Sequence, residues 1–124
     1  MQNKEKDPHG LDPHEPGSKL DAGKPRIWEF VLGYFPNAIK AVAEVSEYGA
    51  KKYTSMGWST VPDGPVRYTE ALIRHAVDEA EAYNWGPPEA YVDQSGLWHD
   101  MQEAWNALAK LELRIRNSRT AKPS

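Results

Sequence analysis

The spacing of apolar residues along the chain predicts helices and no sustained strand. Between residues 36 and 53, apolar and small side chains recur every three or four positions, which is the period of one face of an α-helix. We expect that face to point inward, and it contains Ile39, Val42, Val45, Ser46 and Gly49. Alternation with a period of two, which is typical of a half-buried strand, is not sustained in the sequence.

Two further segments have the same helical period. One begins near Pro65, where proline suits the first turn and Asp63 could cap the helix, and continues to about Tyr83. The other follows Ser95 and runs to about Arg116. The residues expected to face inward are Thr69, Leu72, Ile73, Ala76, Val77 and Ala80 on the second helix, and Leu97, Met101, Ala104, Leu108, Leu111 and Ile115 on the third. Three helices of this kind predict an all-α fold, a helical bundle.

The 124 residues suffice for one domain with a modest core. Residues 1–18 are polar and rich in Pro and Gly, which predicts a flexible N-terminal arm, followed by a helical domain over residues 19–116 and a flexible tail over residues 117–124. Five Trp and six Tyr are many for so small a core. Because Trp98, Trp105 and Leu113 also fall outside the expected inward face, we expect a homo-oligomer, a dimer or a tetramer.

Composition excludes several classes of function. The absence of Cys rules out disulfides, thiolate zinc sites and a cysteine nucleophile, and fits a reducing cytoplasm. No apolar run approaches the length that crosses a membrane, and the N-terminus lacks the apolar stretch of a signal peptide. Net charge is −3 with both signs interspersed, which argues against a polynucleotide partner but leaves a small phosphorylated ligand open.

Two acidic groups with one-turn spacing are the first candidates for chemistry. Glu44 and Glu47 share one side of the first helix, and His75, Asp78 and Glu79 lie together on the second. Gathered carboxylates favour Mg²⁺ or Mn²⁺, which balances their charge and leaves coordination positions for a phosphate. The alternative is a solvated face on the first helix, with i, i+4 pairs to lysines that each stabilise by only about 0.3 kcal/mol.

The third helix carries a polar row of His99, Gln102 and Asn106 beside Trp98 and Trp105. Amides next to an aromatic face suit the recognition of a nucleobase. A row of hydrogen bonds at a subunit contact explains the same pattern equally well.

Two loop segments add further polar groups. Asp93 and Ser95 precede the third helix and could cap it. Near the N-terminus, Lys24 and Arg26 stand in a short stretch with Gly23 that could wrap a phosphate.

Taken together, these features resemble the MazG-like all-α nucleoside triphosphate pyrophosphohydrolases. More closely, the chain is similar to the phage-associated, MazZ-like dATP/dGTP diphosphohydrolase family. The resemblance covers residues 19–113, and its landmarks are Asp21-x-Gly-Lys-Pro-Arg26, Glu44 with Tyr48-Gly-Ala-Lys-Lys-Tyr53, Gly57-Trp58, Arg74-His75, Asp93-x-Ser-Gly96, His99 and Trp105-Asn106. In the broader pattern of Glu-x-x-Glu followed by Glu-x-x-Asp, Glu44 and Glu47 match the first half and Asp78 the last acid. His75 stands where the pattern has Glu, and the adjacent Glu79 could substitute.

The resemblance implies hydrolysis of dGTP, or of dATP, to the monophosphate and pyrophosphate with Mg²⁺ or Mn²⁺. In the phage setting, in the host cytoplasm, the product dGMP would supply 2-aminoadenine nucleotide synthesis. Either Glu47 or Glu79 would be the general base. The residues available to the substrate are Lys24, Arg26, Lys51 and Lys52 for the β and γ oxygens, Gln102 and Asn106 for the base, and Asp93 and His99 for the sugar.

Two other functions are compatible with the sequence. One is a non-enzymatic helical-bundle adaptor whose acidic face is solvated and whose aromatic rows serve self-assembly. The other is a metal phosphohydrolase that releases phosphate or triphosphate, for which His99-Asp100 is a doublet without the additional histidines such a site uses.

Overall fold

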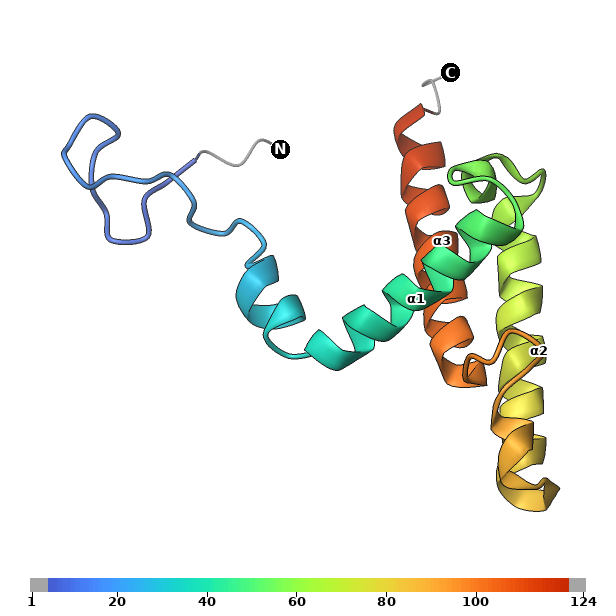
Figure 1. Ribbon diagram of the computed structural model, residues 1–124. Helices are drawn as coiled ribbons and strands as arrows, with labels where there is room; N and C mark the ends of the chain where they lie inside the picture. Colours follow the sequence, from blue (N-terminus) through green and yellow to red (C-terminus); the bar gives the residue numbers. More distant parts are fainter. Residues whose placement is uncertain (1–4, 121–124) are drawn as a thin grey trace. The chain divides into compact units, whose positions relative to one another are not determined.

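The structure is a computed structural model, and it describes residues 5–120 (Figure 1). The chain divides into two compact units, Met1–Phe35 and Pro36–Ser124, which are described separately.

In the first unit, turns are organised around the carboxylate of Asp7. Asp7 Oδ1 accepts hydrogen bonds from the backbone N–H of His9 at 2.7 Å and of Leu11 at 3.4 Å, and Oδ2 accepts one from the N–H of Lys19 at 2.8 Å. The bond from Lys19 is the main reason why the pKa of Asp7 lies below its usual value. A short π-helical turn, η1, follows at Trp28–Leu32.

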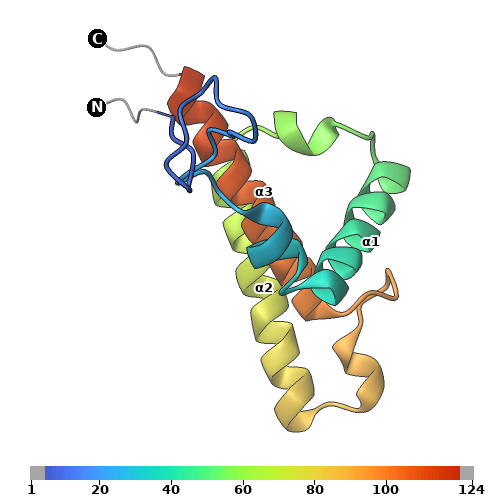
Figure 2. The ribbon, with the colours of Figure 1, turned by 90° about the vertical axis from the view of Figure 1, so that its left-hand side faces the viewer.

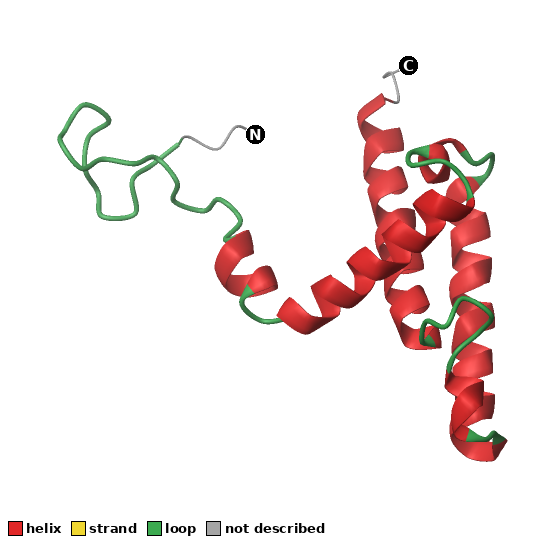
Figure 3. Ribbon diagram, in the orientation of Figure 1, coloured by secondary structure: helices red, strands yellow, loops and turns green. Residues whose placement is uncertain are grey.

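The second unit contains three α-helices: α1 at Pro36–Lys52, α2 at Gly64–Trp85 and α3 at His99–Thr120. Two single turns of 3-10 helix, η2 at Gly57–Thr60 and η3 at Pro88–Tyr91, lie in the connections. The prediction of an all-α fold is thus confirmed, and the three predicted helices end within a few residues of the observed ones (Figure 3). None of the described helices combines the length and apolar composition that a bilayer crossing requires.

Helices α2 and α3 run antiparallel and pack along each other, while α1 packs chiefly against α3. Figure 2 shows that α1 meets the first turns of α3 and then diverges from it toward η2. The contact between α2 and α3 is close because small residues line it. A Cβ on Gly64 would lie 2.8 Å from Leu113 Cδ1, so glycine lets the start of α2 approach α3. In the described part of the chain, the buried hydrophobic residues are Ala82, Ala109 and Leu113.

The inward face predicted for α2 was partly wrong. Thr69, Leu72 and Ala76 are half-buried as expected, but Ile73 and Val77 are 53% and 58% exposed. Ala80 is exposed as well. The side of α2 that meets α3 also carries Tyr68, His75 and Glu79.

The inward face predicted for the third helix was also partly wrong. Leu108 and Leu111 are 50% and 55% exposed, and Ala104 and Ile115 are exposed, while Leu97 and Met101 are half-buried. The residues buried on α3 are His99, Asn106, Ala109 and Leu113. The apolar stripe predicts the core face, whereas the α2–α3 contact is formed mainly by small and polar residues, which permit a closer approach.

On α1, Ile39, Val42, Val45 and Gly49 are half-buried and Ser46 is exposed, so this helix contributes no fully buried residue. The predicted cap of α2 was also wrong. Asp63 stands at the N-cap position with φ 55°, in the left-handed region, and its side chain makes no capping hydrogen bond. A capping side chain reaches the first-turn N–H groups from an extended backbone, which Asp63 lacks.

Candidate functional site

Polar side chains gather where α2 faces the first half of α3. His75 and Glu79 are one turn apart on α2, and His99 and Glu103 are one turn apart on α3. Because the two helices are packed side by side, these residues form one interhelical row, which we call the α2–α3 polar seam.

The two histidines of the seam contact each other directly. Nδ1 of His75 lies 2.9 Å from Nδ1 of His99, and the ring centroids are 5.2 Å apart. One ring must donate this hydrogen bond and the other must accept it, so the contact requires at least one ring to be neutral. Burial and the charge of His99 lower the pKa of His75, against the opposing effect of Asp93 and Asp78. His75 is therefore held in its neutral form, with its Nδ1 engaged on α3.

Asp93 fixes the loop ahead of α3 to the first turn of that helix. Its Oδ1 accepts hydrogen bonds from the N–H of Ser95 at 2.8 Å and from the Ser95 hydroxyl, and Oδ2 accepts one from Gln102 Nε2 at 3.0 Å. Burial raises the pKa of Asp93, but these hydrogen bonds outweigh it and hold the pKa below its usual value. Asp93 and Ser95 therefore stabilise the turn ahead of α3 with an ionised carboxylate.

Glu79 and Glu103 form a pair of acids across the seam. Their carboxyl groups are within hydrogen-bonding reach, and burial, this contact, the charge of Glu79 and the charge of Asp100 together raise the pKa of Glu103 to about 7. Such a hydrogen bond exists only when one of the two carboxyls carries a proton. When both are ionised, Glu103 Oε2 is buried without a donor.

The acids of α1 lie elsewhere in the second unit. Glu44 and Glu47 are both exposed. Glu44 lines a hollow of about 540 Å³ between α1 and the start of α3, together with Lys40, Trp98 and Asp100.

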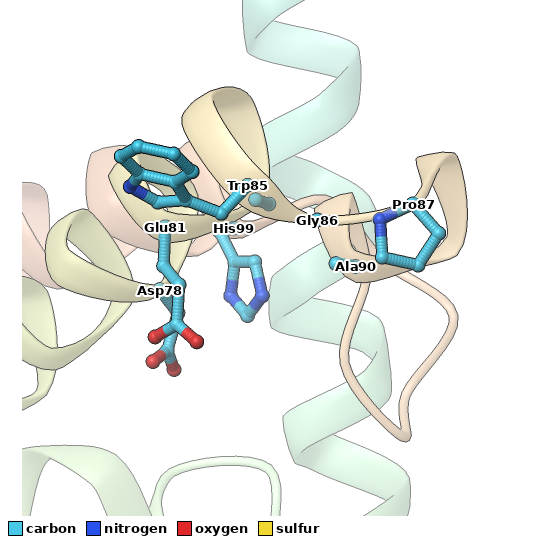
Figure 4. Close-up of a pocket in the computed structure, with 8 residues that line it drawn as sticks. Asp78, Glu81, Trp85, Gly86, Pro87, Ala90 and His99 are labelled. Atoms are coloured by element: carbon cyan, nitrogen blue, oxygen red, sulfur yellow. The ribbon is translucent and has the colours of Figure 1, made fainter.

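Asp78 lines a second hollow, of about 370 Å³, at the C-terminal end of α2. Its walls include Glu81, Trp85 and His99. Figure 4 shows the carboxylates of Asp78 and Glu81 extending in the same direction as the His99 ring.

The predicted ligands Glu44, Glu47, His75, Asp78 and Glu79 thus do not converge on one point of a single chain. Across residues 5–120, no three His, Asp or Glu side chains are arranged to hold one metal ion. His75 and Glu79 share the seam, Asp78 lies on the adjacent hollow, and the acids of α1 are on a separate surface. Their assignment as metal ligands stays a prediction.

The candidate phosphate-binding cations are divided between the two units. In the first unit, Lys24 pairs with Glu5 at 3.2 Å and Arg26 pairs with Glu29. In the second unit, Lys51 and Lys52 end α1 and are exposed. Lys52 Nζ lies 5.2 Å from the centroid of the Tyr53 ring, and the neighbouring Tyr53 hydroxyl raises the pKa of Lys52.

The polar row predicted for base recognition makes contacts within the chain. Asn106 is buried and its Nδ2 donates to the Gln102 carbonyl oxygen at 2.7 Å, while Gln102 Nε2 reaches Asp93 and the Leu97 carbonyl. Trp105 Nε1 donates to Ser46 Oγ at 2.8 Å.

The half-buried Trp105 ring packs against other aromatic groups. It packs edge to face against Trp58 of η2 and Tyr68 of α2, with centroid separations of 6.1 and 5.5 Å. The Tyr68 hydroxyl donates to the Trp58 carbonyl oxygen at 2.6 Å. Together with the Trp105–Ser46 hydrogen bond, this aromatic cluster joins η2 to all three α-helices. Trp98 is 60% exposed.

Glu103 is the residue of the seam that sequence reasoning missed. Its spacing of four from His99 could have placed it on the polar row. Nothing in the sequence indicated that Glu103 would lie opposite Glu79 of α2.

Comparison with known proteins gives one match. Residues 14–122 match the family described as dATP/dGTP diphosphohydrolase, N-terminal. No curated protein and no solved structure matches the chain.

Proposed function

Because the chain belongs to the dATP/dGTP diphosphohydrolase family, which makes it a nucleoside triphosphate pyrophosphohydrolase, we propose that its preferred substrate is dGTP and its second substrate dATP. The products are the deoxynucleoside monophosphate and pyrophosphate. The observation that carries this proposal is the family match across residues 14–122, which includes every α-helix of the second unit. In a phage-infected cell, the dGMP formed would feed the synthesis of 2-aminoadenine nucleotides.

We further propose that the reaction depends on Mg²⁺ or Mn²⁺. The chemistry of the seam fits a cation, because Glu103 Oε2 is buried beside a second carboxyl group and has no donor when both carboxyls are ionised. When bound, the ion would neutralise triphosphate oxygens and lower the pKa of a water molecule. Asp78 and Glu79 of α2 are our candidate ligands, with Glu44 and Glu47 of α1 as further ones.

The positions of the remaining candidate residues determine the roles that we propose for them, as general base or as phosphate-binding cations. Glu79 lies at the seam and Glu47 on an exposed face of α1, and either could take a proton from the attacking water. Lys51 and Lys52 are free to approach the β and γ oxygens, since neither forms an ion pair among the described residues. We also propose that the protein acts as a homo-oligomer.

The test is pyrophosphate release from a panel of dNTPs and NTPs with Mg²⁺, Mn²⁺ or EDTA. We expect dGTP and dATP to be the best substrates and EDTA to abolish turnover. Release of phosphate or triphosphate instead of pyrophosphate would contradict the proposed chemistry. Equal turnover of all nucleotides would contradict the proposed substrate preference.

A second experiment tests the carboxylates. Glu44→Gln, Glu47→Gln and Glu79→Gln keep the size of the side chain but remove its charge, and each should lower kcat roughly hundredfold or more. Glu70→Gln, at an exposed position on α2, is the matched control and should leave kcat unchanged. Wild-type turnover in both α1 variants would exclude Glu44 and Glu47 from the site.

A further inference from the structure

We infer that Asp7 is a positioning residue for the substrate triphosphate: its carboxylate closes the loop between residues 7 and 19 and so fixes the segment that carries Lys24 and Arg26. This inference rests on the proposed function, since the triphosphate of the substrate is the anion that the two cations would bind. All the residues involved belong to the first unit.

The first argument is that three consecutive residues contact the segment that follows the loop. Residues 5–7, which we call the clasp, meet residues 19–24 in antiparallel order. The three contacts are each 3.2 Å or shorter, and they join Glu5 to Lys24, Lys6 to Ala22 and Asp7 to Lys19. The clasp therefore holds the cationic segment at three successive points.

The second argument is that Asp7 is the buried member of the clasp. It is 8% exposed, and both of its carboxylate oxygens accept hydrogen bonds. Oδ1 serves the turn that contains His9 and Leu11, whereas Oδ2 reaches the N–H of Lys19, twelve residues along the chain. Hydrogen bonds to an ionised carboxylate are the stronger kind, and the lowered pKa of Asp7 keeps it ionised. Closure of the loop thus depends on this one side chain.

The third argument comes from a repeat within the loop. The tripeptide Asp-Pro-His occurs at residues 7–9 and again at residues 12–14. Asp12, in the second copy, is exposed, and its carbonyl oxygen accepts a local bond from the Glu15 N–H at 3.0 Å. Because the local sequence is the same, the burial of Asp7 follows from its contact with Lys19. The clasp also precedes the range 14–122 that matches the family, so the family assignment gives it no role.

The fourth argument is that the two cations stay accessible to an anion. The side chains of Lys24 and Arg26 are 54% and 64% exposed, and those of their partners Glu5 and Glu29 are also more than half exposed. Ion pairs at such positions stabilise little, so a triphosphate with several charges can replace these partners. A backbone that is fixed in advance lowers the ordering cost of that binding.

The experiment removes one acceptor from the clasp and measures binding of inorganic triphosphate to the full chain by calorimetry. Asp7→Asn keeps an oxygen for the turn at His9 and Leu11 but presents an amide NH₂ to the N–H of Lys19. Loss of a negative charge would by itself tighten anion binding, whereas loss of positioning weakens it, so the two effects have opposite signs. We expect the Kd for inorganic triphosphate and the KM for dGTP to rise roughly fivefold or more, with kcat within about twofold of the wild type.

The matched control is Asp12→Asn, which makes the same change in the second copy of the tripeptide. It should leave the Kd, the KM and the exchange rate of the Lys19 amide hydrogen unchanged, while Asp7→Asn should accelerate that exchange. An Asp7→Asn protein with the triphosphate affinity and KM of the wild type would overturn the inference.

A second comparison separates positioning from a general loss of stability. In a chain that carries both Lys24→Ala and Arg26→Ala, Asp7→Asn should change the KM by less than about twofold, because the side chains that Asp7 positions are gone. An equal change of KM in both backgrounds, or a fall of kcat in both, would show that Asp7 acts in another way and would overturn the inference.

The outcomes also distinguish this inference from the proposed function. If pyrophosphate is released from dGTP while Asp7→Asn binds inorganic triphosphate normally, the activity stands and the role of Asp7 fails. If triphosphate binding depends on Asp7 but no nucleotide is hydrolysed, the role of Asp7 stands and the proposed function fails.

Discussion

Glu103 keeps its proton to a higher pH than an ordinary glutamate, because burial disfavours its charged form and the carboxyl of Glu79 lies beside it. Its pKa rises from 4.5 to about 7 in the folded chain. Between these values the folded state holds a proton that the unfolded state has released. The resulting stabilisation is fully present below about pH 4.5 and is lost as the pH rises through about 7.

We therefore predict a pH dependence of stability in EDTA. The free energy of unfolding of the wild type should fall between pH 4.5 and pH 7 relative to that of Glu103→Gln, which lacks the titrating group. Urea unfolding of both proteins across this range measures the difference. Parallel curves for the two proteins would show that Glu103 titrates normally.

Single residues also explain how much of the site could be read from the sequence. Helical spacing identified His75, Glu79, His99 and Gln102 as candidates. The structure brings the first three to the contact of α2 with α3, while Gln102 contacts Asp93 in the loop ahead of α3. Helical spacing did not reveal that Glu103 of α3 would face Glu79 of α2, because that contact depends on how the two helices are aligned against each other. Glu44 and Glu47 showed the clearest acidic spacing, yet α1 packs chiefly on α3 and leaves both exposed.

At the scale of elements, periodicity located the helices but not the faces that meet. Proline at the start of α2 and Gly96 ahead of α3 are local signals, so they fix helix ends without tertiary information. Which face is buried depends on the partner. In α2 and α3 several large apolar residues lie away from the contact, namely Ile73, Val77, Leu108 and Leu111, whereas Gly64, Ala109 and Leu113 are in it. A helical wheel that ranks faces by hydrophobicity therefore selects a face that only partly overlaps the contact.

The close approach of α2 and α3 gives a prediction about Gly64. Gly64→Ala would place a Cβ 2.8 Å from Leu113 Cδ1, and because Leu113 is buried we expect a loss of about 1–2 kcal/mol in the free energy of unfolding. Gly49→Ala on α1 is the matched control, because a Cβ there meets no atom within 4 Å. The control should gain up to about 1 kcal/mol from helix propensity. Thermal or urea unfolding measures both, and equal gains in the two variants would contradict the tight contact.

At the scale of the molecule, the chain leaves two apolar stripes uncovered. On α2, Val66, Ile73 and Val77 are more than half exposed, and on α3, Leu108 and Leu111 are half exposed or more. Both stripes lie on the helix faces turned away from the α2–α3 contact. Across residues 5–120 the buried hydrophobic residues are two alanines and one leucine, which is little core to offset the entropy of folding. Burial of these stripes by a second copy would supply the missing apolar contact.

The last prediction is therefore that the protein is a homo-oligomer through these stripes. Leu108→Glu combined with Leu111→Glu places two charges on the α3 stripe and should lower the oligomer mass at micromolar concentration, because a buried charge without a partner is costly. Ala107→Glu, on an exposed part of the same helix, is the control and should keep the wild-type mass. Light scattering combined with size-exclusion chromatography measures all three proteins. A monomeric wild type would refute self-association, whereas an unchanged mass in the double variant would exclude the α3 stripe and leave the α2 stripe at Ile73 and Val77 as the surface to substitute next.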